Sequence, residues 1–330
     1  MSRRLSALLL GLSGALLAPA ADPVSEMLIV VGAPGEADYA EVFADTTAAW
    51  RRAADQGRLK VTVINKNGLP PESMPSAHDA WRKWLAARAT PEAIDVPLWI
   101  VYVGHGTYDS RETRLNLPGP DVTAVELRDW LTPVQRPMVI VHGGSASAPI
   151  INALSAPDRI IISATENGYE LNFARFGSRF ANMVANADAD IDRDGQTSLL
   201  EAFVRASQQT QDYYVEAGRL ATEHAIIDDN GDAQGTPYDW FNGTRLAKKP
   251  EDTSVVPDGA RARVWTLVPS PEELALTPAQ RAERDRLEAA VERLRLRKPE
   301  LPDHEYYEAL EDLFTQLAEV YGYTGGEAPE

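Results

Sequence analysis

Short apolar runs alternate with amphipathic segments along most of the chain. The runs are rich in β-branched residues and end at glycine, proline or polar turns, which is typical of strands buried on both faces of a parallel sheet. The expected strands are 26–32, 59–64, 98–103, 138–141 and 158–163. Helical spacing of apolar residues occupies 38–57, 76–89 and 123–131. This alternation predicts an α/β fold with a doubly wound, mostly parallel sheet of about six strands.

The pattern changes after the last predicted strand. Residues 107–120 are polar and rich in turn residues, which predicts a small hairpin or flap, and 261–268 is expected to supply an edge strand. From residue 271 onward the composition shifts to Ala, Arg, Glu and Leu, with two apolar stripes separated by prolines at 299 and 302. We therefore expect an α/β domain over 21–270 and a C-terminal helical hairpin over 271–330. The hairpin is too small to hold a core alone and should pack on the main domain or on a partner.

The first twenty residues have the features of a secretory signal peptide. Arg3 and Arg4 precede an apolar stretch, 5–17, that is too short to span a bilayer, and small residues follow at 18–20. We expect cleavage after Ala20 and a periplasmic or secreted protein that is not inserted in a membrane.

Composition narrows the possible chemistry. The 330 residues carry a formal net charge of −17 and include no cysteine. The acidic balance argues against nucleic acid or an anionic membrane surface as a partner, and it suits a protein that binds divalent cations. The absence of cysteine excludes disulfides, thiolate metal sites and thiol catalysis.

One acidic segment has the spacing of an EF-hand calcium loop. Asp190, Asp192 and Asp194 occupy positions one, three and five, Gly195 position six and Glu201 position twelve. Ca²⁺ prefers about seven oxygen ligands, the glycine permits the sharp bend, and the last glutamate closes the site with both carboxylate oxygens. The predicted metal ligands are Asp190, Asp192, Asp194, Gln196, Ser198 and Glu201. Helices over 176–187 and 199–215 are expected to flank this loop.

A second acidic turn follows at 228–232. It offers similar oxygen donors, but it has no glycine at position six and no closing glutamate. Two interpretations stay open: an Asx-type turn that needs no ion, or a second ion site.

Two predicted strands end in glycine-flanked polar residues. His105 lies between Gly104 and Gly106 after the strand 98–103, and Ser145 follows Gly144 after the strand 138–141. Because ligands of open α/β sheets bind at the carboxyl ends of the strands, we expect His105 and Ser145 to lie near each other on adjacent strands.

This arrangement resembles the legumain-like and caspase-type cysteine peptidases, in particular secreted bacterial members of the legumain-like family. The resemblance spans about residues 26–243 and is most specific at 104–106; the segment 160–175 is similar to the family's next strand and specificity-side loop. It implies a caspase-like fold, a peptide or protein substrate, and a catalytic site of His105 and Gly106 with Gly144 and Ser145, where Ser145 takes the position of the nucleophilic cysteine.

The chain departs from that family at the nucleophile itself. A serine hydroxyl has no accessible ionised form near neutral pH and needs a base in direct contact, whereas the histidine of this family is only loosely coupled to the nucleophile. We therefore expect a calcium-binding peptidase homologue with weak or no proteolysis. If only the nucleophile has changed, Ser145→Cys should create cleavage after Asn or Asp.

Three alternatives stay open. The protein could be an active hydrolase that uses Ser145 and His105. It could be an ordinary serine hydrolase, because 143–147 differs from a GxSxG elbow by one residue, with His224 or His304 as the downstream base. It could also be a calcium-binding periplasmic scaffold without an active site. The sequence does not define the oligomeric state.

Overall fold

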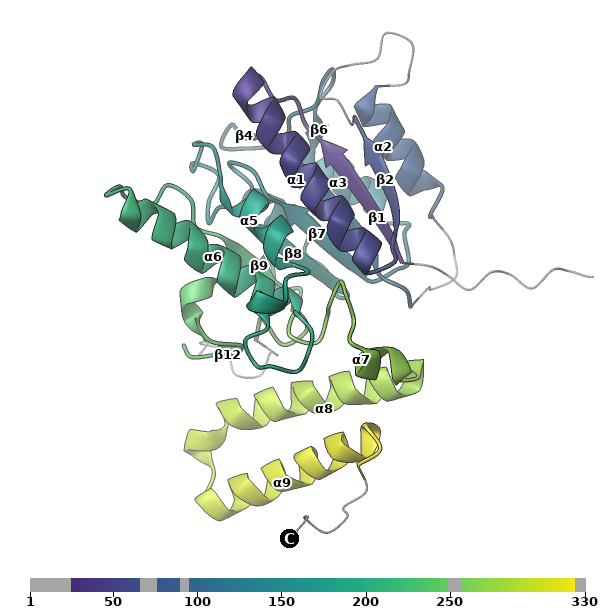
Figure 1. Cartoon of the computed structure of the whole chain (residues 1–330), viewed down its shortest axis with the longest axis vertical. Coiled ribbons are helices and arrows are strands. Elements are labelled where there is room, and N and C mark those ends of the chain that lie inside the picture. Colours follow the sequence, from purple (N-terminus) through teal and green to yellow (C-terminus); the bar gives the residue numbers. More distant parts are fainter. Residues whose placement is uncertain (1–24, 66–75, 90–94, 249–256, 324–330) are drawn as a thin grey trace, which may run out of the picture.

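The computed structural model describes residues 25–65, 76–89, 95–248 and 257–323, so the predicted signal peptide lies outside the described residues. A seven-stranded sheet forms the centre of the molecule, in the order β10-β9-β8-β7-β3-β1-β2 (Figure 1). Its strands are β1 (Glu26–Val31), β2 (Lys60–Ile64), β3 (Leu98–Val103), β7 (Met138–His142), β8 (Arg159–Ser163), β9 (Ile226–Asp228) and β10 (Thr236–Pro237). The pairs from β2 to β8 are parallel, and β9 and β10 are antiparallel to their neighbours.

Helices cover both faces of this sheet. On one face lie α1 (Ala37–Gln56), α5 (Phe176–Met183) and α6 (Leu199–Glu216), and on the other lie α2 (Ala77–Ala86), α3 (Ala124–Leu131) and α4 (Pro149–Leu154). Local sequence explains where some of them begin. Ser76 caps α2, and Thr123 forms a capping box with Glu126 at α3. The predicted α/β architecture with a mostly parallel sheet is confirmed.

The last edge strand was placed wrongly by the sequence pattern. The sheet ends in β9 and β10, whereas the predicted strand 261–268 forms turns and contributes only an isolated bridge between Thr266 and Ser198. The buried Asp229 carboxylate accepts hydrogen bonds from the backbone of Gly259, Arg261 and Ala262. These bonds wrap the chain around one side chain and prevent an extended conformation.

The polar segment after β3 forms a small antiparallel sheet above the strand ends, as the turn-rich sequence predicts. Its strands are β4 (Gly106–Tyr108), β5 (Thr113–Leu115) and β6 (Val122–Thr123). A two-stranded ribbon of β11 (Phe241–Asn242) and β12 (Arg245–Leu246) lies elsewhere, and short 3-10 turns occupy Ala187–Ala189, Tyr238–Trp240 and Lys298–Glu300.

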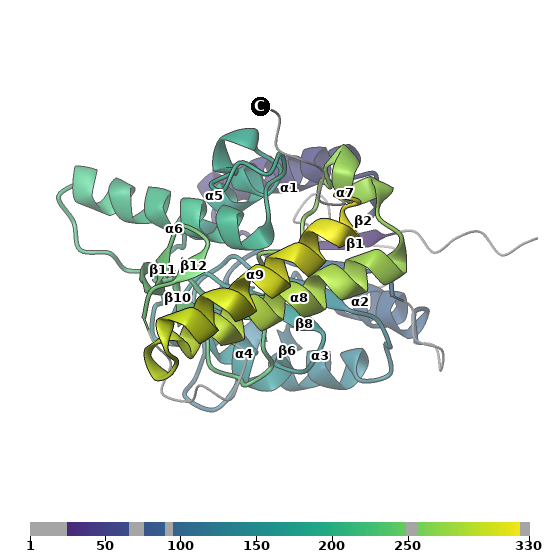
Figure 2. The ribbon, with the colours of Figure 1, turned by 90° about the horizontal axis from the view of Figure 1, so that it is seen from below.

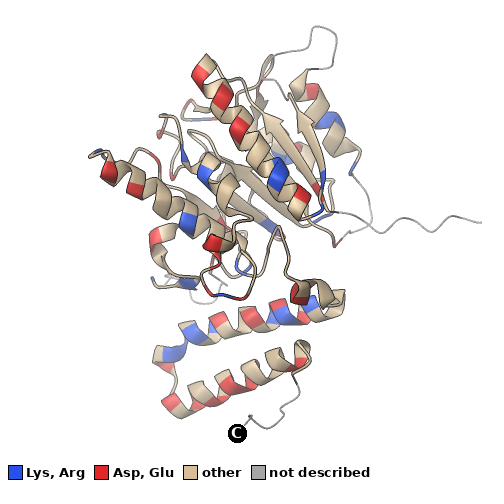
Figure 3. Ribbon diagram, viewed as in Figure 1, with Lys and Arg blue, Asp and Glu red and all other residues tan. Residues whose placement is uncertain are grey.

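The C-terminal helices lie beneath the sheet domain: α7 (Pro271–Ala275), α8 (Pro278–Leu296) and α9 (Asp303–Val320) (Figure 2). Leu287, Val291 and Leu317 form a small core between α8 and α9. Arg263 joins α8 to the main domain through ion pairs with Glu288 and Glu292. Basic residues are frequent on α8, whereas α9 is mainly acidic (Figure 3). Among the described helices, none is long and apolar enough to cross a membrane.

Candidate functional site

The two glycine-flanked strand ends lie side by side, as expected. Strands β3 and β7 are adjacent and parallel, and Tyr102 pairs with His142 at their carboxyl ends. The loops that carry His105 and Ser145 therefore leave the sheet at the same edge.

His105 lies in an aromatic cavity on the α1 side of this edge. Its ring centroid is 4.8 Å from that of Tyr39, 5.2 Å from that of Phe43 and 6.0 Å from that of Phe173. The same cavity is lined by Gly104, Gly144, Trp50 and Ser178. The imidazole is thus held by ring contacts from α1 and from the loop before α5.

The hydrogen bonds of His105 define its chemical state. Nε2 lies 3.3 Å from the carbonyl oxygen of Pro34, and because a carbonyl only accepts, Nε2 carries the proton. Burial lowers the pKa of His105, and the hydrogen bond to Pro34 opposes this shift. The ring is therefore neutral near pH 7, with the lone pair of Nδ1 available as a base.

Close backbone contacts join the two strand ends. A Cβ atom on Gly144 would lie 1.9 Å from the carbonyl oxygen of Gly104, and one on Gly106 would lie 2.4 Å from the carbonyl oxygen of Ser145. Tyr102 supports this arrangement from below, because its hydroxyl lies 2.8 Å from the carbonyl oxygens of His105 and Asn116. Position 144 faces the cavity but has no room for any side chain.

The Ser145 hydroxyl is hydrogen-bonded to the main chain. Ser145 is 3% exposed, and its Oγ donates to the carbonyl oxygen of Gly106 at 3.3 Å. Among the described residues, no hydrogen bond joins Ser145 to His105, and Ser145 does not line the aromatic cavity. Ser145 lies at the predicted edge of the sheet with its hydroxyl directed to the Gly106 carbonyl, whereas Gly144 lines the cavity beside His105.

His142 is a second histidine at this edge, and it is fully buried. Its Nδ1 accepts a hydrogen bond from the backbone N–H of Gly144 at 3.2 Å, while Nε2 has no partner. Burial lowers the pKa of His142 to about 3, so the ring is neutral. It packs 4.9 Å from the ring of Tyr102 and acts as a structural support for the turn at Gly144.

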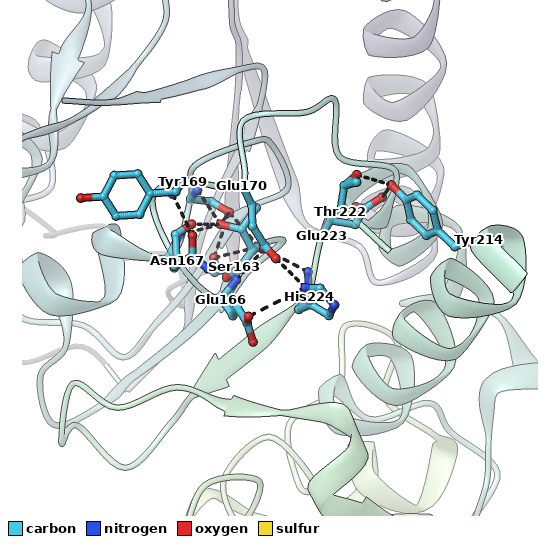
Figure 4. A network of polar contacts seen from close by, with 12 residues as sticks. Ser163, Glu166, Asn167, Tyr169, Glu170, Tyr214, Thr222, Glu223 and His224 are labelled. Carbon is cyan, nitrogen blue, oxygen red and sulfur yellow. Dashed lines mark hydrogen bonds and ion pairs between the residues drawn. The ribbon is translucent and has the colours of Figure 1, made fainter. Parts of the chain in front are cut away.

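The loop that follows β8 borders the site and is held by a polar network (Figure 4). The carboxylate of Glu170 accepts from the backbone N–H groups of Glu166 and His224 and lies 2.5 Å from His224 Nδ1. The Glu170 carbonyl oxygen accepts from the backbone N–H of Ala146. Glu223 holds the end of the loop, because its carboxylate accepts from the N–H groups of residues 175 and 176. Residues 223–224 therefore fix the loop against the turn that contains Ser145.

This network also decides between the candidate downstream histidines. His224 lies in an irregular segment between α6 and β9. Its hydrogen bond to Glu170 occupies it, and no hydrogen bond links it to Ser145 within the described ranges. His304 is exposed near the start of α9, in the C-terminal hairpin. Neither arrangement forms the triad of an ordinary serine hydrolase.

The predicted calcium loop joins α5 to α6 and brings its acidic residues together. Donor atoms of Asp190, Asp192 and Asp194 all lie within 4.8 Å of one another. Gly195 has a φ of +89°, a left-handed conformation that favours glycine. Glu201 is 1% exposed: Oε1 accepts from the N–H groups of residues 191 and 192, and Oε2 accepts from the N–H and hydroxyl of Ser198.

The loop's electrostatics are those of converging like charges. Burial raises the pKa of Asp192 to about 6, with further contributions from Glu201, Asp194 and Asp190. The pKa of Asp194 is also raised, mainly by burial. Gln196 holds the loop against the segment before α7, because its Oε1 accepts from the backbone N–H of Ser270.

Several residues of the site could not be found from the sequence. The aromatic contacts of Tyr39 and Phe173 with His105 each join segments more than sixty residues apart in the sequence, and no local pattern predicts them. The role of Tyr102 is also hidden, because it lies within an apolar strand. The glycines that flank His105 were the only local signal at this site.

Comparisons with known proteins concern the fold. No protein-family model and no curated protein sequence matches the chain. Among solved structures, the chain is similar to the Drosophila initiator caspase Dronc, with 12% identity, a TM-score of 0.41 and coverage of 64% of this chain and 81% of that one. Caspase-1 from Spodoptera frugiperda is also 12% identical, with a TM-score of 0.40 and coverage of 63% and 87%. Protein GSU0716 from Geobacter sulfurreducens has the same identity and TM-score, with coverage of 69% and 100%.

Likeness at this level says nothing about activity. The protein is a mixed α/β protein with a mostly parallel seven-stranded sheet.

Proposed function

We propose that this protein is an exported, calcium-binding homologue of legumain-like peptidases that binds peptide at the carboxyl edge of β3 and β7 and hydrolyses it weakly or not at all. His105 is retained as a neutral base in an aromatic cavity, but no nucleophile accompanies it. The protein would then act by holding an extended peptide or a protein segment.

The observation that carries this proposal is the set of hydrogen bonds that the hydroxyl groups around His105 form. The cavity contains Thr46, Ser178 and Tyr102, and each hydroxyl donates to a main-chain carbonyl oxygen. Ser145 is buried and donates to a carbonyl as well. A hydroxyl acts as a nucleophile only when a base is in direct contact with it, and none of these hydroxyls is hydrogen-bonded to His105.

The active hydrolase that uses Ser145 and His105 is the less favoured alternative. It would require the turn at 144–146 to reverse, although Ala146 is tied to Glu170 and Gly144 to His142. The glycine contact between Gly104 and Gly144 would also have to open. Binding without chemistry needs none of these changes.

The calcium part of the proposal rests on the residues of the loop 190–201. Three carboxylates converge there, and a divalent cation would relieve their mutual repulsion, which adds to burial in raising the pKa of Asp192. The ion would be held by Asp190, Asp192, Asp194 and Glu201, with the Gln196 carbonyl and the Ser198 position completing the shell. The loop joins two helices that pack on the sheet, so the ion would stabilise the fold and take no part in chemistry.

Binding can be tested apart from turnover. The protein without its first twenty residues is incubated with fluorescent peptides that contain Asn or Asp, and anisotropy is measured in millimolar Ca²⁺. We expect saturable binding that His105→Ala or Phe173→Ala weakens by at least about tenfold, with no loss of intact peptide. Equal binding by both variants and the wild type would place the peptide elsewhere and overturn the proposed site.

A further inference from the structure

The second acidic turn has the same spacing of oxygen donors as the first calcium loop. Asp228, Asn230, Asp232 and Gln234 stand at positions one, three, five and seven, as Asp190, Asp192, Asp194 and Gln196 do in the first loop. The backbone follows the same course. Residues four and six have positive φ in both loops, at +63° and +89° in the first and at +82° and +64° in the second.

The hydrogen bonds within the two loops correspond as well. The N–H of Gly231 donates to Asp228 Oδ1 at 3.1 Å, as the N–H at the same position of the first loop donates to its leading aspartate at 2.6 Å. The N–H of Gln234 donates to Asp232 Oδ1 at 2.7 Å, and the matching distance in the first loop is 3.0 Å. The EF-hand motif has a glycine at position six, and the second loop has Ala233 there. Ala233 nevertheless adopts the left-handed conformation that this position requires.

One buried carboxylate oxygen in this turn has no partner. Asp228 is 1% exposed, and its Oδ2 makes no well-formed hydrogen bond although it is shielded from water; the Ser155 side chain and the Ala233 N–H also act on this carboxylate. Its Oδ1 accepts from Gly231, three residues further on, so the carboxylate faces the interior of the turn. A buried, unpartnered carboxylate oxygen is costly unless it is hydrogen-bonded or coordinates a cation.

The surroundings add two buried aspartates, and Arg261 offsets part of the charge of one of them, Asp229. Asp229 and Asp258 are 3% and 5% exposed and lie next to Asp228. Their oxygens accept from backbone N–H groups and from the Thr236 hydroxyl. Within the described part of the chain, none of these three aspartates forms an ion pair with a lysine or arginine. The turn therefore concentrates buried carboxylates around an unpartnered oxygen.

We infer that residues 228–234 form a second Ca²⁺ site, in which Asp228 Oδ2, Asn230, Asp232 and the main-chain carbonyl of Gln234 hold the ion and water fills the remaining positions. The site lacks a closing carboxylate: Asp239, at position twelve, is paired with Lys248 at 2.6 Å. Calcium should therefore bind with a dissociation constant in the range of about 10⁻⁴–10⁻³ M, which is typical of extracellular modules.

Equilibrium dialysis of the full mature protein against Ca²⁺ alone, up to about 5 mM, counts the sites. We expect two ions for the wild type and one for Asp232→Asn, which keeps the acceptor for Gln234 but loses a ligand charge. Asp239→Asn is the matched control, because it removes a neighbouring carboxylate outside the proposed ligand set, and it should still bind two. Asp228→Asn tests the buried oxygen itself. If Asp228→Asn fails to fold, Asp232→Asn still provides the test, because Asp232 is exposed.

The paired change Asp192→Asn and Asp194→Asn in the first loop separates the two sites. One ion retained by this variant, and lost when Asp232→Asn is added, supports the second site. The second site would be overturned if the wild type bound one ion, if the first-loop variant bound none and if Asp232→Asn still bound one. That result would support the first site alone. One ion lost only in Asp232→Asn would instead overturn the first loop's assignment. No binding at all would overturn both.

Discussion

Glu201 is the residue whose replacement best tests how the proposed calcium loop over 190–201 is built. Its buried carboxylate receives four donors: the N–H groups of residues 191 and 192 at 2.7 and 3.1 Å, and the N–H and hydroxyl of Ser198, both at 2.8 Å. Glutamine has the same shape but offers one oxygen and one NH₂ group. The substitution Glu201→Gln therefore keeps the packing and removes only charge and acceptors.

The least costly orientation of the glutamine leaves its oxygen on the two N–H groups of the loop. Its NH₂ group then faces the N–H of Ser198, and this N–H loses its hydrogen-bond acceptor. The Ser198 hydroxyl can turn and accept a hydrogen bond from the NH₂ group. One orphaned buried donor costs about 1–3 kcal/mol, and two hydrogen bonds to a neutral instead of a charged acceptor lose about 1 kcal/mol each. Relief of the repulsion with Asp192 acts in the opposite direction. We expect a net loss of about 3 kcal/mol of unfolding free energy without calcium, or roughly 6–12 °C in melting temperature.

Thermal unfolding followed by circular dichroism, in chelator and in 5 mM Ca²⁺, measures both roles of Glu201. The wild type should gain stability with Ca²⁺ and the variant should gain little, because a ligand that binds only the native state stabilises it. Glu216→Gln, at the exposed far end of α6, is the matched control and should behave as the wild type. A variant that melts within about 2 °C of the wild type in chelator would refute the hydrogen-bond reasoning, and an undiminished calcium shift would refute coordination by Glu201.

Three further predictions concern the strand ends. Gly144→Ala should lower the unfolding free energy in urea by at least about 2 kcal/mol, because its Cβ would meet the carbonyl oxygen of Gly104 at 1.9 Å; unchanged stability would show that the strand ends can separate. Ser145→Cys, which the family resemblance alone predicts to be active, should neither cleave peptides nor react with thiol probes until the protein unfolds, because burial beside the Gly106 carbonyl keeps the thiol protonated; labelling of the folded variant would contradict this. His142 has a folded pKa of about 3 against 6.5 when unfolded, so its contribution is present above pH 6.5 and is lost as the pH falls toward 3. His142→Asn keeps an acceptor for the Gly144 N–H, and the wild type should lose about 2 kcal/mol more than this variant between pH 7 and pH 5; parallel pH profiles would argue against a buried neutral ring.

The sequence predicted those parts of the molecule whose signals are local. Apolar runs identified the five parallel strands, and capping residues such as Ser76 and Thr123 identified helix starts. The hairpin after β3 followed from turn residues. The edge of the sheet was missed because Asp229 captures three backbone N–H groups from a segment about thirty residues away, and nothing in either segment alone indicates that contact.

The candidate site was predicted less completely, for a physical reason. The two loops were correctly placed on adjacent strands because parallel strands end at one edge. The direction of Ser145, however, is set by a left-handed Ala146, by the Glu170 carbonyl oxygen and by the close approach of Gly104 to Gly144. Each of these is set by contacts between distant segments. Counting residues from the end of the strand could therefore not tell whether position 144 or position 145 lines the cavity beside His105.

The most direct test of the absence of a working nucleophile is turnover by the wild-type protein. Purified mature protein in 5 mM Ca²⁺ is incubated with peptidyl-Asn and peptidyl-Asp reporters and with an activated ester, beside His105→Ala and Ser145→Ala. The structure predicts that all three proteins release product at the same rate, equal to the background, although the wild type binds the peptides. Turnover by the wild type that disappears in both variants would contradict it, because Ser145 and His105 would then have to act together.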